Sequence, residues 1–319
     1  MNILENLKSK LGERVEHNKN ISAYFTMKTQ TVAEYFFQAE TRDELINAIK
    51  VAHELNLPMF MLGGGSNIAV LHSQIPGLTL RNLYQDKKIL SENDHDVELF
   101  VSSGYSTSRL AAETARDGFE GFEFQFGLPG SVGGAICMNS KWVARMDYEG
   151  TFPKYMGDSL IRATLLDRSG NIKEVDHDYF HFAYDYSILQ ETKELFLEGV
   201  FKLKKNNPVE LAKRTKDALA YRHKTQLVGM RTCGCMFQNI SEELKNEKGL
   251  PTTSAGYLID QCGLKNTKIG DFVVSEKHAN FIVNTGSGNP EDLVSLLALI
   301  KSKVKEKFGI ELKEEVVLV

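Results

Sequence analysis

"LGGGSN", residues 62–67, and "GLPGSVGGAICMN", residues 127–139, are the two stretches that decide the fold. The first follows the apolar run "MFML" directly, as a loop follows a strand. Its three glycines let the backbone turn sharply and approach a ligand, while Ser66 and Asn67 add side-chain donors. Taken alone, the stretch is equally well explained as an ordinary tight turn. It is neither a Walker loop nor a GxGxxG fingerprint.

The second stretch makes a bound ligand the better interpretation. Its glycines are Gly127, Gly130, Gly133 and Gly134, and they surround Pro129 and Ser131. Such a segment can open a helix toward an anion, because free N–H groups and the helix dipole both favour phosphate. Two glycine-rich loops in one N-terminal domain suggest two walls around one diphosphate. Residue chemistry therefore predicts a nucleotide or dinucleotide ligand.

Strands and helices surround both loops without a regular βαβ period. We predict helices over 41–56, 106–118, 208–225, 254–263 and 290–309, and a hairpin over 160–175 that turns at 169–171. Strands are expected near 35–39, 97–104, 195–205, 272–275, 280–284 and 311–319. This mixture predicts an α+β fold and not a doubly wound sheet. The stretch "KNNP", residues 205–208, predicts a domain boundary.

The bulk composition excludes several classes of protein. Lys plus Arg number 38 and Asp plus Glu number 42, a net charge of -4, so nucleic acid is not an expected partner. The N-terminal residues lack the apolar core of a signal peptide, and no run of about 18 apolar residues suggests a membrane span. Four cysteines in 319 residues do not form a disulfide framework. We expect a cytoplasmic monomer with no membrane partner.

The two loops, in this order and about 60 residues apart, resemble the FAD-binding domain of the UDP-N-acetylenolpyruvoylglucosamine reductase (MurB) family. "TCGCMFQN", residues 232–239, resembles the Gly-Ser-x-Phe-x-Asn segment of that family. Residues 255–284 are very close to the family pattern, and "FGIELKEEVVLV", residues 308–319, resembles its closing strand. The resemblance covers nearly the whole chain, and the modest length fits the shorter, second type.

The resemblance implies a fold and a reaction. It implies an α+β protein with a two-subdomain FAD-binding domain of the PCMH/vanillyl-alcohol-oxidase-like type over 1–205, divided near 72, and a C-terminal α+β substrate-binding domain over 206–319. It implies that NADPH reduces FAD, and that the reduced flavin passes hydride to the enolpyruvyl group of a UDP-sugar to form UDP-N-acetylmuramate for peptidoglycan synthesis. The protein would orient the flavin and manage charge and protons. No metal is implied.

The resemblance also implies a set of flavin contacts. The implied cofactor-binding residues are Leu62, Gly63, Gly64, Gly65, Ser66, Asn67, Gly127, Pro129, Gly130, Ser131, Gly133, Gly134 and Asn139. Two departures from the family put details of these contacts in question. Gln30 and Thr31 stand where the family has Gly-Gly, and "NSKWVARM", residues 139–146, stands where it has Asn-Ala-Gly-Ala-Tyr.

Two catalytic roles match positions of this chain. Cys235 stands at the serine that donates the proton, and a thiol can fill this role because its ordinary pKa of about 8.5 leaves it mostly protonated at neutral pH. Glu315 matches the carboxyl group that stabilises the charge on the substrate carboxylate. The alternatives are a small buried hydrophobe for Cys235 and a solvated strand residue for Glu315.

The third role does not match. Asp185 in "YDYS" stands where the family has an arginine, and a carboxylate would repel a developing negative charge. We hypothesise that another cation, Arg231 in the first instance, supplies the missing charge; the alternative is a surface arginine. Asn239, Lys277 and His278 match substrate-side positions of the family.

Because Asp185 stands where the family has an arginine, other functions remain open. A family member that lost the reductase activity and binds a nucleotide-sugar is the first alternative, and a flavin oxidoreductase with another acceptor is the second. A zinc protein using Cys233 and Cys235 is disfavoured, because the spacing is C-x-C and the only cysteine downstream is Cys262.

Overall fold

The computed structural model describes residues 2–142 and 155–319, so residues 143–146 of the stretch that departs from the family lie outside the described part. The chain forms two compact units. Unit 1 comprises Met1–Asn18, Glu34–Gly64 and Pro76–Arg222, and unit 2 comprises Lys19–Ala33, Gly65–Ile75 and His223–Val319. Unit 2 is therefore built from three separate stretches of sequence.

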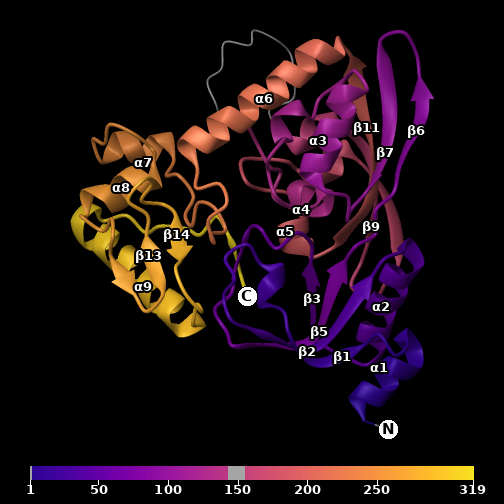
Figure 1. The fold of residues 1–319 in the computed structure, drawn as a ribbon, viewed down its shortest axis with the longest axis horizontal. Helices are drawn as coiled ribbons and strands as arrows, with labels where there is room; N and C mark the ends of the chain where they lie inside the picture. Colours follow the sequence, from indigo (N-terminus) through magenta and orange to yellow (C-terminus); the bar gives the residue numbers. More distant parts are fainter. Residues whose placement is uncertain (1, 143–154) are drawn as a thin grey trace. The chain divides into compact units, whose positions relative to one another are not determined.

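The first sheet has the strand order β1 (Glu16–Asn20), β2 (Val32–Ala39), β5 (Gln74–Asn82) and β3 (Met59–Leu62), with β3 and β5 parallel. Helices α1 (Ile3–Leu11) and α2 (Arg42–Glu54) pack against each other beside it (Figure 1). The Thr41 hydroxyl accepts the Glu44 N–H at the start of α2, as the capping pattern predicts. A short 3-10 turn, η1 (Ser22–Tyr24), lies between β1 and β2.

The second sheet lies within unit 1 and is antiparallel. Its order is β10 (Ile172–Asp176), β9 (Leu160–Leu166), β11 (Leu195–Lys205), β7 (Asp96–Ser102) and β6 (Lys87–Glu92), and β8 (Phe119–Glu120) also pairs with β11. Helix α4 (Val132–Cys137) packs against β7 and β11 (Figure 1). The remaining helical elements here are α3 (Thr107–Arg116), η2 (Glu123–Gln125), η3 (Met156–Ser159), η4 (His177–Phe180), α5 (Leu189–Thr192) and α6 (Pro208–Thr225).

Unit 2 has a small sheet of order β12 (Lys268–Ile269), β13 (Phe272–Val274) and β14 (Ile282–Asn284). Helix α9 (Pro290–Phe308) packs on this sheet and on α8 (Ala255–Gln261), and α7 (Glu242–Glu247) precedes them. A parallel pair, β4 (Ile68–Ala69) with β15 (Val317–Leu318), joins an early stretch of the chain to a late one. The strand expected over 311–319 is thus much shorter than predicted.

The core of unit 2 shows why its three stretches fold together. Met27 from the first stretch and Ala69 from the second are fully buried with Phe237, Leu258 and Leu296 from the third. The α+β fold class predicted from the sequence is confirmed. Among the described helices, none combines the length and the apolar character needed to cross a bilayer.

Candidate active site

The two glycine-rich loops meet inside unit 1. A Cβ atom built on Gly64 would lie 2.5 Å from the Cα of Gly130, and one built on Gly63 would lie 2.5 Å from the Ser131 hydroxyl oxygen. Neither position could hold a side chain without moving the opposite loop. The close approach of the two loops therefore requires glycine at both positions.

The second loop is fastened to the start of α3. The Gly127 N–H donates to the Ser108 hydroxyl at 2.9 Å, and the Gly130 carbonyl accepts the Thr107 N–H at 3.2 Å. Ser131 caps α4 by accepting the Gly134 N–H. Pro129 and Gly134 are exposed on this loop. The Gly133 N–H donates to the Ser103 carbonyl at 2.8 Å, and a Cβ on Gly133 would lie 3.0 Å from that of Ser103.

The first loop changes units within its length. Leu62 ends β3 with a buried side chain, and Gly63 and Gly64 follow in unit 1. Gly65, Ser66 and Asn67 belong to unit 2, where the Gly65 carbonyl accepts the Thr26 N–H at 3.0 Å. The Asn67 amide donates to the Glu315 carbonyl at 3.3 Å, and the Asn67 carbonyl accepts the Val317 N–H at 2.9 Å.

Asn139 ties the end of α4 to a turn at 183–186. Its side-chain amide donates to the Ala183 carbonyl at 3.0 Å, and its side-chain oxygen accepts the Gly157 N–H at 3.1 Å. The residue is buried, with a φ of 44°. Both ends of its side chain are thus engaged in holding the protein together.

Asp185 is not an isolated negative charge. The Lys141 ammonium donates to its two carboxylate oxygens at 3.0 and 3.1 Å, and the same ammonium lies 3.1 Å from the centre of the Tyr184 ring. Burial raises the pKa of Asp185, and the neighbouring Lys141 opposes that rise. Sequence reasoning missed Lys141 as a partner. The available signal was that positions 141 and 185 both depart from the family pattern.

The predicted catalytic residues Cys235 and Glu315 lie on neighbouring backbone segments of unit 2. Cys235 pairs with Phe281 on one side, and Phe237 pairs with Glu314 on the other. The Glu315 N–H donates to the Met236 carbonyl at 2.9 Å, which sets Glu315 beside the Cys235 segment. Both side chains are half-buried.

Cys233 has a different environment. It is buried, with its sulfur 3.6 Å from the Met236 sulfur. Burial raises the pKa of its thiol to about 12. A thiol so reluctant to ionise is suited to packing and not to catalysis or metal binding. None of the four cysteines forms a disulfide bond, and no cluster of His, Cys, Asp or Glu within 2–142 and 155–319 could hold a metal ion.

Arg231 lies at the other end of the segment that carries Cys235. It is exposed, and its guanidinium donates to the Gly286 carbonyl at 2.9 Å. Its own carbonyl accepts the Asn284 N–H. The contacts of Arg231 described here lead to β14 and the turn after it, so its role at Cys235 stays a prediction.

A second arginine, Arg222 of α6, bonds the backbone just before the second glycine-rich loop. Its buried guanidinium donates to the Phe124 and Phe126 carbonyls at 3.0 and 3.1 Å, next to the Trp142 ring. Burial lowers the pKa of Arg222 to about 10. A Cβ on Gly127 would lie 3.5 Å from the Arg222 Cδ, so the side chain lines the floor of the loop.

The three substrate-side candidates lie in unit 2 and have local partners. The Asn239 side chain accepts the Ala255 N–H at the start of α8. The Lys277 ammonium donates to the His223 and Gln226 carbonyls at 3.0 and 2.9 Å. His278 packs on Phe281 with ring centres 4.8 Å apart, and burial lowers its pKa.

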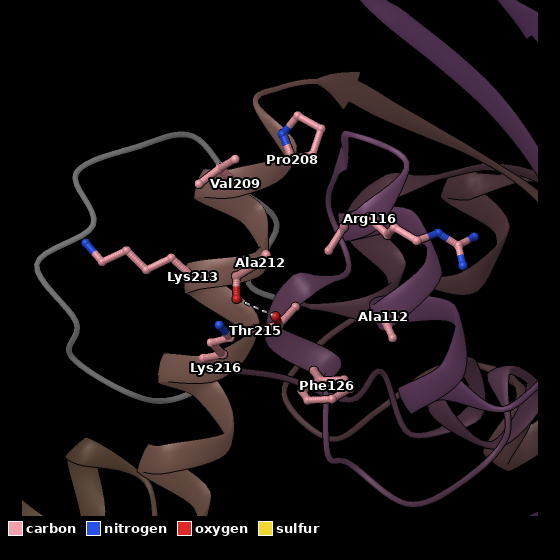
Figure 2. Close-up of a pocket in the computed structure, with 10 residues that line it drawn as sticks. Ala112, Arg116, Phe126, Pro208, Val209, Ala212, Lys213, Thr215 and Lys216 are labelled. Carbon is pink, nitrogen blue, oxygen red and sulfur yellow. Dashed lines mark hydrogen bonds between the residues drawn. The ribbon is translucent and has the colours of Figure 1, made fainter.

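A groove of about 540 Å³ between α3 and α6 contains none of the predicted site residues (Figure 2). Apolar residues, two lysines and one arginine line it. The lining residues are Ala112, Ala115, Arg116, Phe126, Pro208, Val209, Ala212, Lys213, Thr215 and Lys216.

Comparison with known proteins assigns both halves of the chain. Residues 33–176 match the profile of an FAD binding domain, and residues 225–319 match that of the C-terminal domain of UDP-N-acetylenolpyruvoylglucosamine reductase. The reductase of Protochlamydia amoebophila is 34% identical over 89% of this chain and 87% of its own length. That of Caldanaerobacter subterraneus is 31% identical over 99% and 98%.

A solved structure of the same family shows a similar fold. The crystal structure of the Thermus caldophilus reductase superposes with a TM-score of 0.74 at 28% identity, covering 96% of this chain and 98% of the other. These relatives match most or nearly all of the chain in sequence, and the solved structure matches its fold. The chain belongs to the UDP-N-acetylenolpyruvoylglucosamine reductase (MurB) family.

Proposed function

We propose that this protein reduces the enolpyruvyl group of UDP-N-acetylglucosamine enolpyruvate to form UDP-N-acetylmuramate, a precursor of peptidoglycan and so of the cell wall. It is an FAD-containing oxidoreductase that uses NADPH. The observation that carries the proposal is the pairing of the Cys235 segment with the segment that bears Glu315, which places the two predicted catalytic residues on neighbouring stretches of backbone.

The two glycine-rich loops would hold the diphosphate of FAD in this proposal. Their mutual contact supports a shared role, since a Cβ on Gly63 or Gly64 would collide with Ser131 or Gly130 of the opposite loop. The other proposed flavin contacts come from the same two loops. When bound, FAD passes the reducing equivalents of NADPH to the substrate.

Cys235 supplies the proton in this proposal. A thiol is a stronger acid than an alcohol, so Cys235 can give its proton to the carbon next to the one that receives hydride. Cys233 is excluded from the role by its burial.

Glu315 stabilises the charge that builds on the substrate carboxylate. In its neutral form a carboxylic acid donates a hydrogen bond to a developing negative oxygen. Asn239, Lys277 and His278 contribute to binding the UDP-sugar. Arg231 remains the cation proposed from the sequence. Because UDP-sugars and NADPH are cytosolic metabolites, we propose a cytoplasmic enzyme, and we expect a monomer.

Two-step anaerobic mixing tests this function. The oxidised protein is mixed first with NADPH and then with UDP-N-acetylglucosamine enolpyruvate, and flavin absorbance is followed. NADPH should bleach the flavin and the enolpyruvyl sugar should restore its colour, with formation of UDP-N-acetylmuramate. A bleached flavin that the sugar never reoxidises would make the chain a flavoprotein without this activity, and reoxidation by another acceptor alone would indicate a different substrate.

A further inference from the structure

The Lys141–Asp185 ion pair is buried, and its contribution to stability does not by itself explain why it is there. The side chains of Lys141 and Asp185 are 14% and 8% exposed. Removing two opposite charges from water costs free energy that their attraction recovers only in part, so apolar residues in such places are often as stable or more so. An ion pair kept in this position calls for another reason.

The backbone around Asp185 is specially arranged to hold its carboxylate. Asp185 has a φ of 51°, in the left-handed region that residues with a side chain seldom occupy. Ala183 and Tyr186 exchange two hydrogen bonds across it, which closes a tight turn. The Asp185 carbonyl accepts the Gln190 side chain at 2.9 Å. Asn139 fastens the same turn to the end of α4.

The Lys141 ammonium is fixed by this arrangement. Two of its contacts are the carboxylate oxygens of Asp185, and the third is the face of the Tyr184 ring, which favours a cation electrostatically. Lys141 follows Asn139 by two positions, directly after the second glycine-rich segment. The turn, the ring and the carboxylate together place one positive charge beside that segment.

The charges at positions 141 and 185 have changed together relative to the family pattern. The resemblance described above matches positions 141 and 185 to Gly and Arg, whereas this chain has Lys and Asp there. This chain therefore has a cation at position 141 that bonds the residue at position 185. Arg231, the other candidate, is exposed and donates to the Gly286 carbonyl.

We propose that Lys141 is the residue that donates a hydrogen bond to the carboxylate of the enolpyruvyl substrate, and that Asp185 and Tyr184 are positioning residues that hold its ammonium. This inference rests on the proposed reductase function. With both partners present the pair is neutral and offers an N–H donor. Without Lys141 the uncompensated Asp185 repels the substrate, and without Asp185 the ammonium gains net charge but loses its fixed position.

Steady-state and half-reaction kinetics of K141M, D185N, K141R and the double variant K141M/D185N test the proposal. K141M should lower kcat/KM for the enolpyruvyl sugar by about 100-fold, as does the loss of one donor to a developing anion. Reduction by NADPH should stay unchanged. K141R should retain most activity. D185N should bind the sugar more tightly but turn over more slowly, and K141M/D185N should recover part of the loss in K141M.

A matched control lies in the same unit. Lys173 donates to Glu194 at 3.2 Å and lies 3.9 Å from the Tyr179 ring centre, the same three groups in a place without predicted site residues. K173M should keep wild-type kinetics. Bound-flavin absorbance and thermal midpoints show whether each variant is folded. If K141M fails to fold, the other two variants test the proposal. D185N should then bind the sugar more tightly but turn over more slowly, and K141R should remain active.

Some outcomes overturn the inference. Wild-type sugar kinetics in folded K141M, or equal losses of kcat in K141M and D185N with unchanged KM for the sugar, would make the pair purely structural. A wild-type protein that never reduces the enolpyruvyl sugar contradicts the proposed function itself, and so is distinguishable from a failure of Lys141.

Discussion

Cys233 and Cys235 show how far two residues can differ when a single glycine separates them. Gly234 has a φ of 95°, a conformation that turns the chain between the two thiols. Cys233 is buried beside Met236, whereas Cys235 is half-buried on the segment that pairs with Phe281. Cys233 and Cys235 therefore do not act together as one pair of thiols, although only one residue separates them.

Substitution separates the proton-donor role of Cys235 from a packing role. Cys235→Ser should keep measurable reductase activity, because a hydroxyl can still donate a proton, although it is a weaker acid than a thiol. Cys235→Ala should lose activity by roughly 100-fold or more. Single-turnover reoxidation of reduced flavin by the sugar measures this. Equal, wild-type-like rates in both variants would return Cys235 to the status of a buried hydrophobe.

Alkylation should distinguish the two thiols without mutation. The thiolate is the species that reacts with iodoacetamide, and the pKa of Cys233 is raised to about 12. Peptide mass spectrometry should find Cys233 unmodified in the native protein at pH 8 and modified once the chain is unfolded in urea. Labelling of Cys233 at the same rate in both states would contradict the buried position.

One carboxylate of helix α3, that of Glu113, links the helix to strand β6 of the second sheet. Glu113 accepts hydrogen bonds from Lys87 at 2.6 Å, the Tyr105 hydroxyl at 2.6 Å and Arg109 at 2.8 Å. Burial acts to raise the pKa of Glu113, but these donors outweigh it and lower the pKa from 4.5 to about 2. Since the start of α3 carries the second glycine-rich loop, this anchor also supports the flavin site.

The anchor should make stability depend on pH. A carboxylate with a lowered pKa stabilises the folded state above its ordinary pKa, and the effect is lost as the pH falls from about 4.5 toward 2. Glu113→Gln should therefore destabilise the protein at pH 7 by about 2 kcal/mol. The difference from wild type should shrink at pH 3. Urea denaturation at both pH values measures it, and a difference that does not depend on pH would contradict the assignment.

The elements that the sequence predicts well are those with local signals. Helices α2 and α6 begin where Thr41 and Pro208 place them, because caps and prolines act within one turn. The strand expected over 311–319 is reduced to Val317–Leu318, because its length depends on its partner β4. Lys141 was missed for the same reason, since its partner is 44 residues away.

The candidate site shows the same division between features with local sequence signals and features that depend on distant contacts. The two glycine-rich loops, which the sequence analysis considered together, lie against each other at Gly63 and Gly64 on one side and Gly130 and Ser131 on the other. A diphosphate between them stays a prediction. The contact residues themselves stay predictions, as do the boundaries near 72 and 205. Those boundaries follow composition and resemblance, whereas the compact units follow contacts in space.

Unit 2 should depend on all three of its stretches. A fragment of residues 206–319 lacks Met27 and Ala69, which are fully buried in the core of the unit, and it lacks β4, the partner of β15. It also lacks the Met27 and Lys28 carbonyls that accept the Asn284 side chain. We expect this fragment to be poorly folded.

Circular dichroism and thermal melting of the fragment test this expectation. The expected result is a broad, non-cooperative transition with exposed apolar surface, while the full chain with bound flavin melts cooperatively as a control. A sharp transition in the fragment at a temperature near that of the full chain would show that residues 19–33 and 65–75 are dispensable for the core.

The β4–β15 pair also has a consequence for synthesis of the protein. Asn67 bonds Glu315, a residue 248 positions later, and Val317 follows as its next partner. At about 5–20 residues per second, a ribosome needs roughly 10–50 s to make the chain between them. During that interval the strand edge at Ile68–Ala69 is without its partner. The nascent protein therefore exposes, for most of its translation, the edge that its final residues later cover.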